Sequence, residues 1–157
     1  MLRISKLSDY AIIVLGHMAK QPGRSFAAHE LAEASGIGSP TASKVLKTMA
    51  KAGLLISIRG ARGGYQLALK PEQTSIASII GALEGPIALT ECTLAQSQCD
   101  QSRTCHVQGN WSLINRAIQT ALEAITLADM TQPMQRTPRD FHVPLHQIAV
   151  HSHRPEE

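Results

Sequence analysis

Long apolar runs are missing from this chain of 157 residues, and aromatic residues make up only 3% of it. No stretch reaches the roughly 18 apolar residues of a membrane-spanning helix. The start of the chain, MLRISKLSDYAIIVLGHMAK, is interrupted by Ser8, Asp9 and His17 and lacks the apolar stretch and cleavage site of a signal peptide. We therefore expect a cytoplasmic protein whose core is built from aliphatic side chains.

Cysteine is scarce as well, with only three in the chain, all of them in the segment CTLAQSQCDQSRTCH at 92–106. Disulfides are rare in the cytoplasm, and an odd number of cysteines leaves one without a partner. The chain has no glycine-rich nucleotide-binding pattern and no Ser/His/Asp set, so we do not expect an enzyme. The three neighbouring thiols are therefore the feature that most needs a function.

Acidic residues are depleted in one half of the chain. Residues 1–71 carry ten Lys/Arg against three Asp/Glu, whereas residues 72–157 carry five against nine. The net charge of +3 thus combines a balance of +7 in the first half with −4 in the second. A strongly basic half is typical of a domain that binds a polyanion such as nucleic acid.

Three helices are predicted in the basic half, over residues 5–20, residues 27–35 and from Ser39 to about residue 52. Their apolar residues recur at spacings of three and four, which gives each helix one buried face. In the second helix this pattern turns Leu31 and Ala34 inward, and Gly36 ends the helix; Ser39 then caps the third helix. Two short helices around a glycine-bearing turn are typical of a helix-turn-helix, whose second helix enters the major groove of DNA.

The predicted recognition helix carries hydroxyl side chains at its start and three lysines along one outer stripe. Two strands follow, 54–58 and 65–69, around a glycine-rich hairpin with two arginines, which is typical of a wing. A basic run is often only a solvated surface, but residues 34–71 contain six Lys/Arg and no acid, which favours DNA. The predicted DNA-contacting residues are Ser39, Thr41, Ser43, Lys44, Lys47, Lys51, Arg59 and Arg62.

A fourth helix, opened by Thr74 and Ser75, completes a DNA-binding domain predicted to span residues 1–85. Farther along, residues 110–130 are predicted to form one long helix with an apolar seam of nearly three heptads. This helix could pack back on its own core or pair with its twin, and palindromic operators favour a two-fold dimer. The predicted dimerisation residues are Trp111, Ile114, Ile118, Ala121 and Ile125.

The predicted fold class is mainly α: a winged helix-turn-helix domain with a two-stranded β wing, plus a long C-terminal dimerisation helix. Residues 86–109 between these parts form the cysteine-bearing segment. The tail, residues 131–157, contains four prolines and four histidines (at 142, 146, 151 and 153), and we expect it to be largely disordered.

Several kinds of chemistry compete for the cysteines. Zinc with His106 as a further ligand is possible, but the gaps of six and five residues between Cys92, Cys99 and Cys105 lack the usual Cys-x₂₋₄-Cys knuckle. Redox-active thiols without a metal are a second reading, with only Arg103 close to a cysteine. Plain buried cysteines are a third. An iron–sulfur cluster is favoured, because it is wider than one ion and can be held by thiolates on a loose loop.

The whole pattern resembles a known family, the Rrf-type bacterial winged-helix regulators that include the iron–sulfur regulator IscR and the nitric-oxide sensor NsrR. Within it, the chain is most similar to the branch of SUF-system iron–sulfur assembly regulators. The resemblance covers about residues 1–130. It rests on LRISKLSDYA, GIGSPTASKVLKTMAKAGLL, RGARGGYQLA, EGPIALTEC and the three-cysteine segment running into GNW.

The resemblance implies a homodimeric transcription factor, expected to be a repressor, that binds double-stranded DNA at a palindromic operator and controls genes for iron–sulfur cluster assembly. It implies that Cys92, Cys99 and Cys105 hold a [2Fe–2S] or [4Fe–4S] cluster whose presence sets DNA affinity. The alternative is a cluster-free or zinc-bearing repressor that senses thiol oxidation.

The fourth cluster ligand is where this chain departs from its apparent relatives. IscR-like members have a histidine three residues after the last cysteine, but that position is Gln108 here, and His106 follows Cys105 directly. NsrR-like members use an aspartate near the start of the first helix of the partner subunit, a position that Asp9 matches. We therefore rank Asp9 first and His106 second, ahead of Glu91 and Gln108, although an acid in a first helical turn is also favoured by the helix dipole alone.

Overall fold

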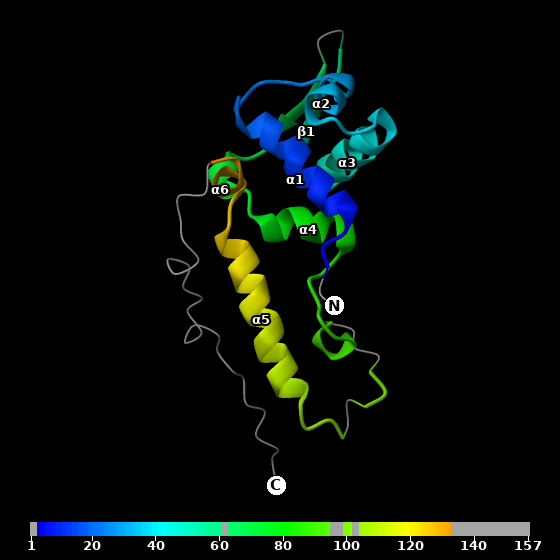
Figure 1. Ribbon diagram of the computed structural model, residues 1–157, viewed down its shortest axis with the longest axis vertical. Helices are drawn as coiled ribbons and strands as arrows, with labels where there is room; N and C mark the ends of the chain where they lie inside the picture. Colours follow the sequence, from blue (N-terminus) through cyan, green and yellow to red (C-terminus); the bar gives the residue numbers. More distant parts are fainter. Residues whose placement is uncertain (1–2, 61–62, 95–98, 102–103, 133–157) are drawn as a thin grey trace.

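The computed structural model describes residues 3–60, 63–94, 99–101 and 104–132, and shows a winged-helix domain from which one long helix extends (Figure 1). Its helices are α1 (Lys6–Ala19), α2 (Ala28–Ser35), α3 (Ser39–Lys51), α4 (Ile76–Glu84), α5 (Gln108–Ala124) and α6 (Leu127–Thr131). Two strands, β1 (Leu55–Ile58) and β2 (Gly64–Leu67), and two short 3₁₀ helices, η1 (Pro71–Gln73) and η2 (Glu91–Thr93), complete the described elements. The predicted fold class is thus confirmed.

The core lies around α1, which packs against α2, α3, α4 and α6. Aliphatic side chains and methionines dominate it, as expected from the scarcity of aromatics; Leu15, Met18, Leu46 and Met49 are fully buried. In α2 the buried residues are Leu31 and Ala32, whereas Ala34 is exposed, so the prediction for Ala34 was wrong. A helix of eight residues has only two turns, and its periodicity is too short to define a face.

The helix termini follow ordinary capping chemistry. Ser5 caps α1 by accepting a hydrogen bond from the Ser8 N–H, and Ser75 caps α4 by accepting one from the Ser78 N–H. Gly36 ends α2 at φ 67°, a left-handed conformation in which a side chain would be strained. The cap of α3 is Gly38, one residue before the predicted Ser39, since Ser39 already has helical geometry.

The two strands form the expected antiparallel hairpin, with Leu55 opposite Leu67 and Ile58 opposite Gly64. The chain before α2 also joins this sheet. Phe26 exchanges two backbone hydrogen bonds with Tyr65, at 2.9 and 2.8 Å. This extra bridge ties β2, near its loop end, to the chain just before α2.

The predicted single helix over residues 110–130 is instead two helices separated at Ile125 and Thr126. Thr126 adopts extended geometry and forms a capping box with Asp129 that starts α6. The backbone here pairs with the chain before α4: the N–H of Ile76 donates to the Ile125 carbonyl at 2.9 Å, and the N–H of Leu127 to the Thr74 carbonyl at 2.8 Å. These bonds and the burial of Leu127 outweigh continuation of the helix.

Within the ranges described, none of the helices combines the length and the apolar composition that crossing a membrane requires. The predicted disorder of the tail, and the four histidines in it, fall almost wholly on residues 133–157, which lie outside the described residues.

Candidate functional site: a basic reading face and a cysteine segment

The recognition helix α3 is oriented by four core side chains, Ala42, Val45, Leu46 and Met49, all completely buried. Since these residues fix the inner face, the lysines at 44, 47 and 51 lie on the exposed outer face, together with Ser39 at the start of the helix. Thr41 and Ser43 are half-buried beside them. The proposed DNA-contacting residues of α3 therefore share one accessible surface.

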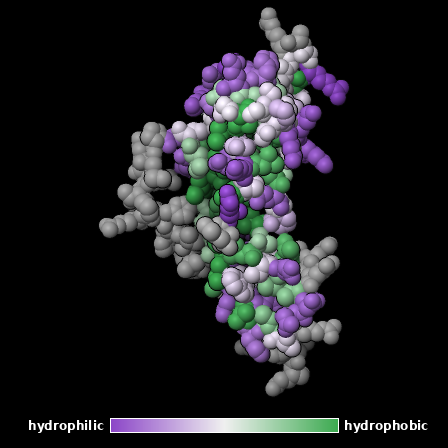
Figure 2. All heavy atoms as spheres, turned by 45° about the vertical axis from the view of Figure 1, so that its right-hand side comes forward, coloured by the Kyte–Doolittle hydropathy of each residue, from purple (hydrophilic) through white to green (hydrophobic). Residues whose placement is uncertain are grey.

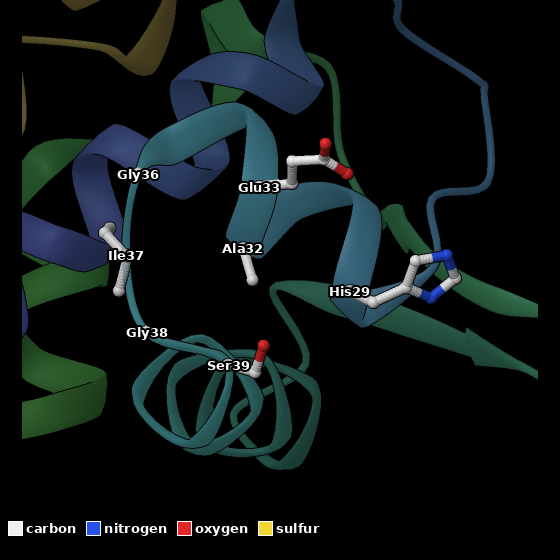
Figure 3. A pocket seen from close by; sticks show the side chains of 7 residues that line it. All are labelled: His29, Ala32, Glu33, Gly36, Ile37, Gly38 and Ser39. Atoms are coloured by element: carbon white, nitrogen blue, oxygen red, sulfur yellow. The ribbon is translucent and has the colours of Figure 1, made fainter.

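A hollow of about 440 Å³ opens beside the first turn of α3. It is lined by His29, Ala32 and Glu33 of α2, by the turn residues 36–38 and by Ser39, whose hydroxyl points into it (Figure 3). Sequence reasoning did not include His29 and Glu33, although their spacing of four places them on one face of α2. The amino end of α3 is therefore exposed at the edge of this hollow.

The wing begins at Arg59, which is exposed directly after β1. Arg62, the other predicted wing contact, lies outside the described residues. At the loop end of β2, a side chain on Gly64 would come within 2.3 Å of the Phe26 carbonyl oxygen, so only glycine allows the Phe26–Tyr65 bridge. The wing is therefore held to the same body as α3.

The cysteine segment connects α4 to α5. Cys92 lies in η2, whereas Cys99 and Cys105 lie in irregular chain, and all three are half-buried and free of disulfides. The Thr90 hydroxyl oxygen lies 3.1 Å from the sulfur of Cys92. The structure thus places three thiols on one segment between the reading domain and the extended helix.

A ready-made metal site is not found in the described part of the chain, where no three His, Cys, Asp or Glu side chains cluster as metal ligands. Asp9 is exposed in the first turn of α1, and His106 is exposed beside Cys105. The donor set itself suits an iron–sulfur cluster, because three cysteines on one segment can supply the thiolate ligands that such clusters use. Binding would require the segment to bring these thiols together.

Asn115 anchors the start of the cysteine segment to α5. Its amide nitrogen donates to the Ile87 carbonyl at 3.0 Å, and its amide oxygen accepts from the Leu89 N–H at 2.9 Å. It is the buried residue of α5, only 8% exposed. Sequence reasoning missed Asn115 because it adjoins the apolar seam and reads as an ordinary polar neighbour of Ile114.

Glu84, at the end of α4 and just before the stretch held by Asn115, joins the same connection to α1. Its carboxylate accepts a hydrogen bond from the Ser5 N–H at 3.1 Å and another from the buried Ser8 hydroxyl. The Ser8 hydroxyl is the main reason that the pKa of Glu84 lies below its ordinary value; burial opposes it, and Ser5 adds to it. The chain between α4 and η2 is thus fixed to α1 through Glu84 and to α5 through Asn115.

Glu84→Gln should lower the melting temperature at pH 7 by about 2–4 °C, since an exposed charged acceptor contributes modestly. The depressed pKa means that its stabilisation is present above the ordinary value of 4.5 and is lost as the pH falls through the folded-state value. The gap between wild type and variant, measured by thermal unfolding, should therefore narrow as the pH falls below 4.5 and close once Glu84 is protonated in the folded protein. Glu72→Gln in η1 is the matched control, and a gap independent of pH would contradict the assignment.

The apolar seam of α5 has two different environments. Toward its end, Leu122 and the following Ile125 pack on the core of the same chain. Toward its start, Trp111 and Ile114 are 40% and 44% exposed. On the face shown in Figure 2, apolar surface continues below the winged helix into the part formed by α5 and the cysteine segment. Ile118 and Ala121 between them are half-buried.

Comparison with known proteins gives a consistent result. The family model Rrf2, described as an iron-dependent transcriptional regulator, matches residues 4–133. The protein rrf2 of Nitratidesulfovibrio vulgaris is 30% identical over 124 residues, which is 79% of this chain and 81% of that protein.

Two solved structures are similar over most of their length. IscR of T. potens matches with a TM-score of 0.63 and 30% identity, covering 87% of this chain and 93% of that one. CymR, the global cysteine regulator of B. subtilis, matches with a TM-score of 0.65 and 27% identity, covering 83% and 97%.

Proposed function

This chain belongs to the Rrf2 family of transcriptional regulators, and from that premise we propose that it is a homodimeric DNA-binding repressor controlled by an iron–sulfur cluster. We further propose that it regulates genes for iron–sulfur cluster assembly. One observation carries the proposal: three half-buried cysteines lie on the segment that links the winged-helix domain to α5. Anything that binds this segment therefore acts between the two parts whose relative position decides DNA binding.

The reading surface is the exposed face of α3 together with the wing. Lysine ammonium groups on α3 and Arg59 on the wing would contact phosphates, and hydroxyl groups at the start of α3 would contact base edges and phosphates. Arg62 is included on the sequence pattern alone. This surface has no acid between residues 34 and 71, which supports a polyanionic ligand.

The cluster, either [2Fe–2S] or [4Fe–4S], would be held by the thiolates of Cys92, Cys99 and Cys105 and would supply a group that is lost or altered by oxidants. Asp9 and His106 are the proposed alternatives for the fourth ligand, in that order. Asp9 is exposed, so its carboxylate is accessible to a partner subunit, and His106 directly follows Cys105.

The chain's own residues provide the coupling to DNA. Drawing the three thiols together would pull on residues 87–92, which Asn115 ties to α5. These residues follow closely on Glu84, whose carboxylate is bonded to α1. In a dimer joined through α5, such a movement changes the distance between the two recognition helices. Because half-site spacing is fixed by the DNA, a small change of this kind alters affinity.

A second candidate is a cluster-free or zinc-bearing repressor that senses thiol oxidation, and the similarity to the cysteine regulator CymR favours it. The two candidates differ in metal content. Protein purified without oxygen should contain iron and acid-labile sulfide and absorb near ~400 nm if the first is right. Stoichiometric zinc, or no metal at all, would support the second.

The dimer is proposed to form through the exposed part of the α5 seam. Ile114→Glu would place a charge in that contact on both subunits, so we expect the dissociation constant of the dimer to rise at least about a hundredfold. Light scattering after size-exclusion chromatography at micromolar concentration should then report a monomer.

Ser112→Glu is the matched control, because it adds the same charge to the opposite side of α5, where Ser112 is exposed. A dimer that withstands Ile114→Glu, or one that Ser112→Glu disrupts equally, would contradict the assignment of this face.

A further inference from the structure

We propose that Asn115 is the positioning residue that fixes Cys92 relative to α5, and that movement of the cysteine segment reaches the dimer helix through this side chain. The second part rests on the proposed function; the first stands on geometry alone. Asn115 makes no contact with the cofactor in this proposal and acts only through the backbone of residues 87–89.

The side-chain amide of Asn115 hydrogen-bonds the backbone of residues 87–89 as a neighbouring peptide group would. The Asn115 amide binds a carbonyl and an N–H two residues apart, Ile87 and Leu89, with both distances near 3 Å. The two bonds therefore fix both the position of residues 87–89 along the α5 axis and their rotation relative to this helix. Such a buried amide is costly to leave without partners, so the contact is held in one geometry.

The anchored residues 87–89 lie only three positions before Cys92, the first of the three cysteines. Thr90 follows Leu89, and its carbonyl accepts hydrogen bonds from the N–H and the hydroxyl of Thr93. The Thr90 hydroxyl oxygen also lies 3.1 Å from the Cys92 sulfur. Since η2 packs against α5, the position of Cys92 is set by a short, continuous set of contacts that begins at Asn115.

Asn115 also borders the face of α5 proposed for dimerisation. It follows Ile114 and is one turn from Trp111, while Leu122 continues its stripe into the core. A shift of residues 87–89 is therefore passed to the part of α5 that carries the exposed apolar seam.

Two variants separate positioning from general stability. Asn115→Asp removes the donor to the Ile87 carbonyl and places a carboxylate against it, whereas Asn115→Leu keeps the shape and loses both bonds. Asn110→Asp, at an exposed position of the same helix, is the matched control for the change from amide to acid.

The first measurement is the rate at which iodoacetamide alkylates each cysteine in the reduced, metal-free protein, with mass spectrometry resolving the three sites. We expect about a tenfold faster reaction at Cys92 in both Asn115 variants, with Cys99, Cys105 and the Asn110→Asp protein unchanged. An unchanged rate at Cys92, or an equal rise at all three cysteines, would overturn the positioning role.

The second measurement is the ratio of DNA affinities between cofactor-free and anaerobically reconstituted protein. This ratio should fall to near one in the Asn115 variants and persist in Asn110→Asp. A full ratio in both Asn115 variants would overturn transmission through this residue. A wild-type ratio of one would contradict the proposed function and with it the transmission, while a selective response at Cys92 would still support the positioning role.

Discussion

Cys92→Ser should purify without oxygen with at least about tenfold less iron and sulfide than wild type, and Cys99→Ser and Cys105→Ser should behave alike. The reason is chemical rather than steric. Serine is nearly the same size, but a hydroxyl does not ionise near neutral pH and cannot replace a thiolate as a strong iron ligand. The fold should survive, because each cysteine is only half-buried and lies outside the core.

Gln101→Ala is the control for this series, since Gln101 lies exposed between Cys99 and Cys105 and has no proposed ligand role. Iron and sulfide should be measured with circular dichroism on the same samples, so that loss of the cofactor is separated from unfolding. Full loading of any one cysteine variant would remove that residue from the ligand set. Full iron and sulfide content in all three cysteine variants would show that the iron–sulfur cofactor is not held by these cysteines.

The second large effect concerns the reading face. The double substitution Lys44→Ala and Lys47→Ala should weaken DNA binding by roughly 10- to 100-fold at physiological salt and reduce the salt slope by about two. Both side chains are exposed, whereas their neighbours Val45 and Leu46 are fully buried, so the core should remain intact. Binding isotherms at several salt concentrations, with specific and unrelated duplexes, report both quantities.

Lys70→Ala is the matched control. Lys70 is also exposed, but it lies outside α3 and directly precedes η1, which packs against α6. An unchanged slope in the double variant, or an equal loss in Lys70→Ala, would show that the basic surface of α3 is not the DNA contact.

Much of the winged helix could be predicted from local sequence alone. Apolar periodicity defined α1 and α3, turn chemistry defined the end of α2 at Gly36, and the arginine–glycine hairpin defined the wing. The errors are local and have physical causes. Ser39 is inside α3 because Gly38, one residue earlier, supplies the non-helical backbone at the cap. Ala34 was misplaced because two helical turns define no clear face.

What could not be predicted depends on contacts between distant segments. The break at Thr126 is fixed by pairing with the backbone at Thr74 and Ile76, about fifty residues earlier. The apolar period runs smoothly through the break and gives no sign of it.

The candidate site shows the same limit. Glu84 and Asn115 act through partners 79 and 26–28 positions away, so no local pattern singles them out. The cysteines were found by their spacing, yet the way their segment is tied to α1 and α5 emerged only from the structure.

The most direct test of the central claim is the affinity of one operator duplex for reconstituted and for cofactor-free protein, measured anaerobically at one fixed salt concentration. We expect the two affinities to differ by about 5- to 150-fold, the usual range of coupling between two sites. Equal affinities for the two forms would contradict the proposed regulation, because the cysteine segment would then have no influence on DNA binding by the winged-helix domains.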